Sequence, residues 1–114
     1  ICLDHGPLII YKEKPSDSIP ENATPVFVGL NAPFDWSFIN YYFLKYLNRN
    51  PFGISAIDIK ALFMGATKCS WHDTKSSSID KYVHPTLQGD HNALHDAKYQ
   101  AELFRLVYEL NRSK

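Results

Sequence analysis

The chain has 114 residues, of which 45% are hydrophobic and 14% aromatic, and this composition is typical of a folded globular protein rather than a disordered one. Its 12 Lys and Arg side chains balance 12 Asp and Glu side chains, so no overall charge attracts it to nucleic acid or to a membrane, and any polyanion site is local. No apolar run reaches the roughly 18 residues that a transmembrane helix needs.

The length predicts a single domain over residues 1–114. Cys2 and Cys69 lie far apart and form no Cys-x-x-Cys pair, which indicates free thiols in a reducing compartment. We therefore expect a cytoplasmic protein, and the first residues carry no charged-then-apolar signal segment. Because the chain opens with Ile1 and not with Met, we also expect the domain to be incomplete at its N-terminus.

The beginning of the chain predicts strands separated by a loop. Short apolar runs at residues 1–3 and 8–11 flank a Gly-Pro break and indicate a hairpin. Residues 12–24 are polar and rich in proline, which is typical of a surface loop. Residues 25–30 are β-branched, aromatic or apolar and predict a buried strand.

The middle of the chain predicts an alternation of helix and strand. Pro33 suits a helix entry, so residues 34–48 are expected to form a helix whose apolar positions nearly surround it and are buried on more than one side. Residues 54–59 then predict a strand and residues 60–65 a short helix. This alternation favours an α/β layer.

The last part of the chain predicts a loop followed by helices. Residues 66–78 are polar and mixed, and a short helix is expected near residues 79–83. Residues 93–111 predict a longer amphipathic helix. Its expected inward side consists of Leu94, Ala97, Ala101, Phe104, Val107 and Tyr108.

Three titratable residues stand where they can do chemistry. Asp35 falls in the first turn of a predicted helix, where the helix dipole favours an ionised carboxylate that can bind a hard cation. His91 precedes Asp96 by five residues, about 140° around a helix, so His91 is expected on the preceding loop. A histidine there can take a proton from water and return it. Taken alone, each of the three is more often an ordinary cap or surface residue.

The two runs that contain these residues resemble known motifs when they are taken together. Residues 26–36 read Val-Phe-Val-Gly-Leu-Asn-Ala-Pro-Phe-Asp-Trp, and residues 91–97 read His-Asn-Ala-Leu-His-Asp-Ala. In order and spacing they resemble the second and third motifs of the DEDDh family of 3'-5' exonucleases. The resemblance implies an RNase H-like mixed sheet flanked by helices, and a site with two Mg²⁺ or Mn²⁺ ions. Asp35 and Asp96 would then be metal ligands and His91 the general base.

The sequence departs from that family in two places. His95 stands where family members often have another acid. No Asp-x-Glu, the first motif of the family, occurs before Asp35. We therefore expect this chain to lack the opening strands of the RNase H-like fold and to carry half of a metal site.

The substrate implied by the resemblance is single-stranded RNA or DNA with a free 3' end. Asn31 and Phe34 flank Asp35 and are candidates for the substrate cleft, with Phe34 stacking on a base, although an aromatic residue at helical spacing is more often part of the core. Residues 58–60 and 100–104 look more like small exoribonucleases, so RNA is favoured.

An alternative function belongs to another class. The chain would then be a catalytically silent exonuclease-like domain that binds nucleic acid or a protein partner. An Asp-x-Glu on an apolar strand encoded before Ile1 would favour the enzyme.

Four further residues have simpler interpretations. Trp36 is expected in the core, and Trp71 either packs on its loop or contacts a second subunit of a homodimer. Cys69 and His72 have a metal-ligand spacing, but two ligands do not make a zinc site.

Overall fold

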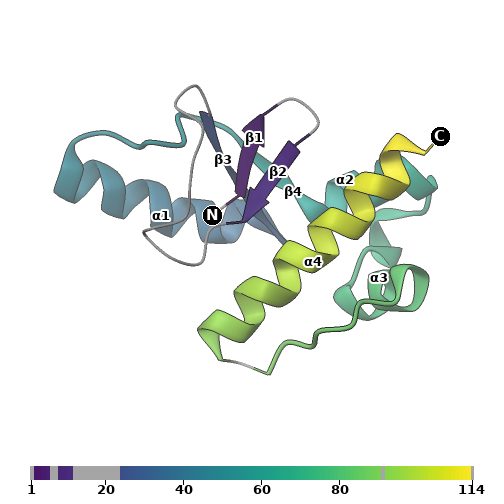
Figure 1. The fold of residues 1–114 in the computed structure, drawn as a ribbon. Coiled ribbons are helices and arrows are strands. Elements are labelled where there is room, and N and C mark those ends of the chain that lie inside the picture. The colour runs from purple at the N-terminus through teal and green to yellow at the C-terminus, as the bar shows by residue number, and fades with distance from the viewer. Residues whose placement is uncertain (1, 6–7, 12–23, 91, 114) are drawn as a thin grey trace. The chain divides into compact units, whose positions relative to one another are not determined.

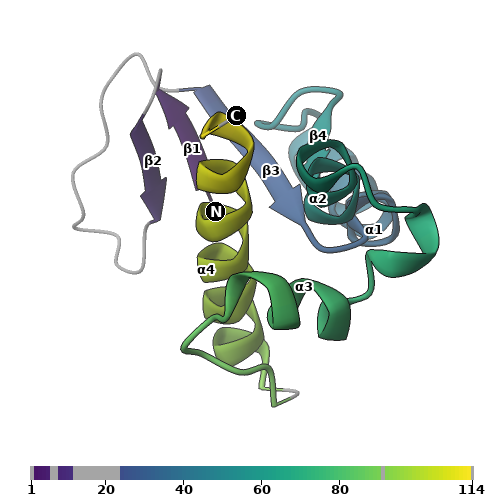
Figure 2. The same cartoon turned by 90° about the vertical axis from the view of Figure 1, so that its right-hand side faces the viewer.

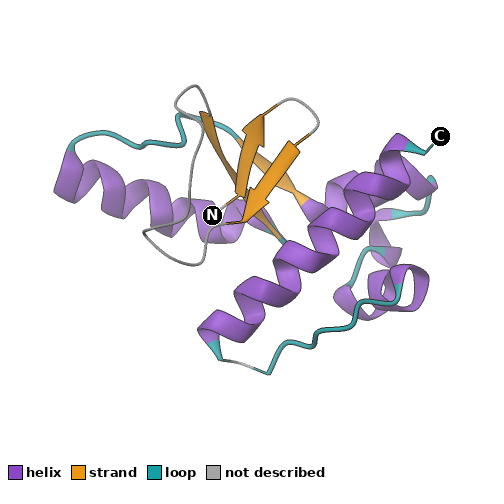
Figure 3. Cartoon of the chain, in the orientation of Figure 1, coloured by secondary structure: helices purple, strands orange, loops and turns teal. Residues whose placement is uncertain are grey.

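The computed structural model describes residues 2–5, 8–11, 24–90 and 92–113 of the chain. By its internal contacts the chain divides into an N-terminal unit, Ile1–Ile57, and a C-terminal unit, Asp58–Lys114. The described strands all precede residue 59, and the described residues after it are helical or loop, as the colours of Figure 3 show. The combination of strands and helices is compatible with an α/β fold.

The N-terminal unit is built on a sheet with the strand order β2-β1-β3-β4. β1 (Cys2–His5) pairs antiparallel with β2 (Leu8–Tyr11), which confirms the predicted hairpin. β1 also pairs antiparallel with β3 (Thr24–Gly29), the strand predicted at residues 25–30. β4 (Ala56–Asp58) lies on the other side of β3. The three strands β1, β2 and β3 are seen side by side in Figure 1.

Helix α1 (Ala32–Leu47) follows β3 directly and confirms the predicted helix, with a start two residues earlier. The turn between them depends on Asn31, whose φ of 61° is left-handed, a conformation that asparagine tolerates better than most residues. Pro33 lies in the first turn, where its missing N–H costs nothing.

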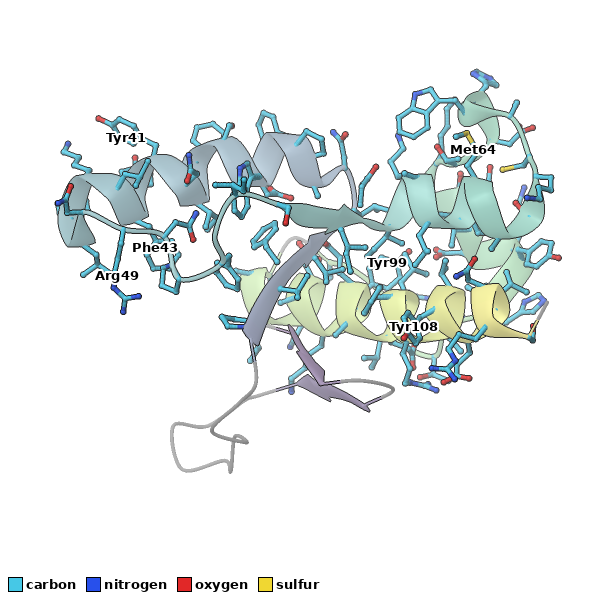
Figure 4. The ribbon with its side chains drawn as sticks, turned by 90° about the horizontal axis from the view of Figure 1, so that it is seen from above. Tyr41, Phe43, Arg49, Met64, Tyr99 and Tyr108 are labelled. Carbon is cyan, nitrogen blue, oxygen red and sulfur yellow. The ribbon has the colours of Figure 1, made fainter. Side chains whose placement is uncertain are left out.

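The expected burial of α1 on more than one side is wrong. Ala32 is its one fully buried residue, and the inward side is a single row in which Trp36 packs edge-on against Phe27 of β3, with ring centroids 5.8 Å apart. Trp36 is therefore half-buried rather than central to the core. Phe43 packs against Phe52, while Tyr41 lies on the opposite side of α1 (Figure 4). The large apolar side chains left exposed on α1 are Phe34, Phe38, Tyr41, Tyr42, Leu44, Tyr46 and Leu47.

The predicted strand at residues 54–59 is too long at both ends. Ile54 is 97% exposed, and β4 begins only at Ala56. The strand stops at Asp58 because its side chain accepts a hydrogen bond from the backbone N–H of Ala61, at 3.3 Å, and so caps helix α2 (Ile59–Thr67). Ile59 is therefore a buried helix residue and not the end of a strand.

The C-terminal unit consists of α2, a short 3-10 turn (Trp71–Asp73), α3 (Ser76–Val83) and α4 (Ala93–Arg112). Both α2 and α3 contact α4, and the three helices are labelled in Figure 2. The segment expected to be a loop at residues 66–78 is thus partly helical. Among the described residues of this unit, those that are buried are Ile59, Phe63, Ala66, Thr74, Ile79, Tyr99, Leu103, Phe104 and Val107.

The buried side of α4 agrees with the predicted one only in part: Phe104 and Val107 are buried as predicted. Leu94 is 55% exposed and Ala97 is exposed, so the first turn of α4 does not enter the core. Tyr99, Leu103 and Val107, four residues apart, form the row that does. None of the described helices combines the length and apolar character required to cross a membrane.

Candidate functional site

Asp35 lies in the first turn of α1, next to the end of β3. A side chain added at Gly29, the last residue of β3, would lie 3.5 Å from Asp35 Oδ2, so the carboxylate faces the strand end. The turn is closed by a hydrogen bond of 3.2 Å from the Phe34 N–H to the Asn31 carbonyl. β3, its turn and α1 therefore present this acid at the edge of the sheet.

Burial raises the pKa of Asp35 above its ordinary value. No described residue forms a hydrogen bond or ion pair with this half-buried carboxylate. Desolvation without a compensating partner disfavours the charged form, and a nearby cation would reverse that effect. The environment of Asp35 therefore fits an oxygen ligand of a divalent metal ion.

Asn31 and Phe34 flank Asp35 and are accessible. Asn31 is exposed, and its side chain makes no capping hydrogen bond to α1. Phe34 is 63% exposed and packs edge-on against Phe38, with ring centroids 5.2 Å apart. Phe34 is thus not a core residue, and both side chains can contact a ligand that reaches Asp35.

Asp96 lies in the first turn of α4, in the C-terminal unit. Asn92 caps this helix, because its side-chain oxygen accepts hydrogen bonds from the N–H groups of Leu94 at 3.0 Å and His95 at 3.2 Å. Asp96 Oδ1 accepts a hydrogen bond of 3.0 Å from the Asp90 N–H. No described residue donates to its other oxygen, Oδ2, which can therefore bind a cation.

Asp90 and His95 form a pair beside Asp96 that the sequence analysis did not predict. His95 Nδ1 lies 2.9 Å from Asp90 Oδ2, and the Asn92 N–H donates to Asp90 Oδ1 at 3.1 Å. The hydrogen bond with His95 and that from Asn92 lower the pKa of the exposed Asp90. The residue at the position of a family acid, His95, thus binds the preceding loop, and the Asp-x-Asn spacing at residues 90–92 was the available signal for a turn.

Glu102 forms hydrogen bonds with Thr86 and Leu87, at the beginning of the loop that joins α3 to α4. Its Oε1 accepts hydrogen bonds from the N–H groups of Thr86 at 2.6 Å and Leu87 at 3.0 Å, and its Oε2 accepts one from Thr86 Oγ1 at 2.6 Å. Desolvation raises the pKa of Glu102, but the hydrogen bonds from Thr86 and Leu87 outweigh it, so the pKa lies below its ordinary value. No sequence pattern indicated this contact.

His91 lies outside the described residues, so its role as a general base stays a prediction. Both of its sequence neighbours form hydrogen bonds: the Asp90 N–H donates to Asp96 Oδ1, and the Asn92 N–H donates to Asp90 Oδ1.

The predicted site residues fall in both units: Asn31, Phe34 and Asp35 belong to the N-terminal unit and Asp96 to the C-terminal unit. Among the described residues, no group of three or more His, Cys, Asp and Glu side chains is gathered that could hold a metal ion. Each of the two units therefore contributes one carboxylate, Asp35 or Asp96, of the kind that suits a hard cation.

The pair Cys69 and His72 gains no further ligand in the described part of the chain. Cys69 is a free, half-buried thiol. Trp71 is half-exposed and lies under the ammonium of Lys60 in α2, with Nζ 4.7 Å from the ring centroid. Its expected packing on the loop or against a second subunit stays a prediction.

The comparison with known proteins bears on the two motifs. No protein-family model matches the chain. The chain is 55% identical over 107 residues to the 3'-5' DNA exonuclease Cap18 of Escherichia coli. The alignment covers 94% of this chain and 57% of that protein, so the chain spans little more than half the length of the curated relative. Since the alignment leaves out only a few residues of the chain, residues 26–36 and 91–97 both lie within it.

Proposed function

We propose that this protein is a metal-dependent 3'-5' exonuclease that hydrolyses single-stranded DNA, with an RNase H-like fold and a site of the DEDDh type. The observation that carries the proposal is the similarity to a protein named as a 3'-5' DNA exonuclease across a stretch that includes both motifs. The placement of Asp35 and Asp96, each in the first turn of a helix, supports it.

Asp35 and Asp96 would hold Mg²⁺ or Mn²⁺. Asp35 offers a partly desolvated carboxylate without a partner among the described residues, and Asp96 offers the oxygen that the Asp90 N–H does not occupy. Both are oxygen ligands, which these ions prefer. When bound, the metal pair supplies charge neutralisation at the phosphate and a more acidic water molecule.

The remaining candidate residues would act on the water and on the nucleotide. His91, in its neutral form, would accept the proton of the attacking water. Phe34 would stack on the 3'-terminal base, which contributes about 1–3 kcal/mol in proteins that bind single strands. Asn31 would donate hydrogen bonds from its free amide to the same nucleotide.

DNA replaces RNA as the favoured substrate. The expectation of RNA rested on short segments at residues 58–60 and 100–104 and finds no support in the comparison, because the relative is named as a DNA exonuclease. Of residues 58–60, Asp58 ends β4 and caps α2, whereas Ile59 and Lys60 belong to the helix. A cytoplasmic location and a homodimer remain predictions.

The alternative is a silent domain that binds nucleic acid or a protein partner. It predicts binding of single strands without hydrolysis at any metal concentration.

One experiment separates these functions. The full-length protein is incubated with single-stranded DNA and with RNA of the same sequence, each with a free or a blocked 3' end, in Mg²⁺, Mn²⁺ or EDTA. We expect stepwise loss of the unblocked DNA with metal and no loss in EDTA. Equal loss of blocked and unblocked strands, or loss in EDTA, would contradict the proposed activity.

A further inference from the structure

Gly89 stands against the carboxylate of Asp96 with no room for a side chain. A Cβ added at Gly89 would lie 2.8 Å from Asp96 Oδ1 and 3.7 Å from its Cγ, and real Cβ atoms essentially never approach a heavy atom within 3.0 Å. The ring of Tyr99 closes the other side, with Cδ2 at 3.8 Å. Any other residue at position 89 would therefore displace Asp96 or the loop.

The loop has little freedom to move away. Glu102 accepts three hydrogen bonds from Thr86 and Leu87. After Gly89, the Asp90 N–H donates to Asp96, and the Asp90 side chain contacts His95. Since the loop is attached to α4 on both sides of Gly89, an added methyl group acts mainly on the Asp96 carboxylate.

Tyr99 is fixed as well. Its ring is buried, and its hydroxyl donates a hydrogen bond to Asp80 of α3. The labelled side chain can be followed on α4 in Figure 4. The ring would be in ordinary van der Waals contact with a Cβ at position 89, so the close approach is to the Asp96 carboxylate alone.

We infer that Gly89 is a positioning residue for Asp96. Because position 89 has no side chain, the loop comes close enough for the Asp90 N–H to bind Asp96 Oδ1, and this bond fixes the carboxylate with Oδ2 available to the metal. The inference rests on the proposed function, in which Asp96 is a metal ligand. Groups that orient a metal ligand commonly change metal affinity or activity about 10–100-fold when they are replaced.

The test compares Gly89→Ala with Gly65→Ala in the full-length protein. Gly65 lies in α2, is exposed and has nothing within 4 Å of an added Cβ, so it is a matched control for the same chemical change. We expect Gly89→Ala to raise the Kd for Mn²⁺ about 10–100-fold, measured from free Mn²⁺ by electron paramagnetic resonance. Gly65→Ala should leave this Kd unchanged.

Kinetics and stability complete the test. Excess Mn²⁺ should restore most of the kcat of Gly89→Ala, because the ligand is displaced and not removed, and Gly89→Val should need more metal than Gly89→Ala. The melting temperature should stay near that of the wild type, since Gly89 lies at the surface. An unchanged Kd for Mn²⁺, or a Gly89→Ala protein that does not fold, would overturn the inference.

The two proposals fail in different ways. A wild-type protein that neither binds Mn²⁺ nor hydrolyses DNA would refute the proposed function. A wild-type protein that does both, with a Gly89→Ala variant of equal Mn²⁺ affinity, would refute only the role of Gly89.

Discussion

Replacement of Glu102 by glutamine tests how the loop before α4 is held. The carboxylate accepts three hydrogen bonds, from the Thr86 N–H and hydroxyl at 2.6 Å each and from the Leu87 N–H at 3.0 Å. Glutamine has one acceptor oxygen, and its NH₂ group would face a donor. A hydrogen bond to a charged group contributes about 1.5–3 kcal/mol, and the lower end applies at this partly solvated site.

We therefore expect Glu102→Gln to lower the free energy of unfolding by about 1–2 kcal/mol at pH 7. In a domain of this size, each kcal/mol lowers the melting temperature by about 4–8 °C. Thermal unfolding followed by circular dichroism measures the effect. Glu109→Gln is the matched control, because Glu109 lies on the same helix, is exposed and forms no side-chain hydrogen bond or ion pair with the described residues.

The effect should also depend on pH in a defined direction. The pKa of Glu102 is lowered in the folded protein from an ordinary value of 4.5, so the contribution of the carboxylate is present above that value and is lost as the pH falls through the folded pKa. The melting temperatures of Glu102→Gln and wild type should therefore converge in acid. Equal stability at pH 7, or a difference that persists unchanged well below pH 4.5, would refute the reasoning.

Three further predictions concern other residues. Tyr99→Phe leaves Asp80 without its hydrogen-bond donor and should lower the free energy of unfolding by about 1–2 kcal/mol. Burial and the bond to Asp80 raise the pKa of Tyr99 above 10.0, so the stability of the wild type should fall above that pH and that of the variant should fall less. His91→Ala should lower kcat about 10²–10⁴-fold with nearly unchanged DNA affinity, whereas a lower melting temperature with a normal rate would indicate a structural role. Asn31→Gly and Asn31→Ala should both raise KM, but only the alanine variant, forced to a φ of 61°, should also lose about 1 kcal/mol of unfolding free energy. An unchanged KM in the glycine variant would exclude a substrate contact.

Local sequence signals were sufficient to predict most of the helices and strands. The β-branched and aromatic run of β3 and the apolar period of α4 are properties of neighbouring residues, and both elements lie where they were predicted. The error at Ile59 arose because an apolar residue suits a strand or a helix equally well, and the Asp58 cap decides between them. The exposure of α1 could not be predicted, because apolar positions do not show how many sides of a helix have neighbours.

The sequence singled out some residues of the candidate site and missed others, because only some of them belong to local motifs. Asp35 and Asp96 belong to short motifs and could be singled out from the sequence alone. Glu102 and Gly89 could not, because their importance depends on Thr86 and Asp96, which approach them only in the folded chain. A contact between a loop and a helix sixteen residues apart leaves no periodic pattern.

The most direct test of the central claim is the Mn²⁺ dependence of nucleotide release from the 3' end of single-stranded DNA by wild type and by Asp96→Asn. If Asp96 is a metal ligand, loss of its charge should weaken Mn²⁺ binding and lower the rate together, and added Mn²⁺ should restore part of the rate, while the melting temperature changes little. The account predicts a half-saturating Mn²⁺ concentration that is higher in the variant by about tenfold or more. Release at the wild-type rate with an unchanged Mn²⁺ dependence in Asp96→Asn would contradict it.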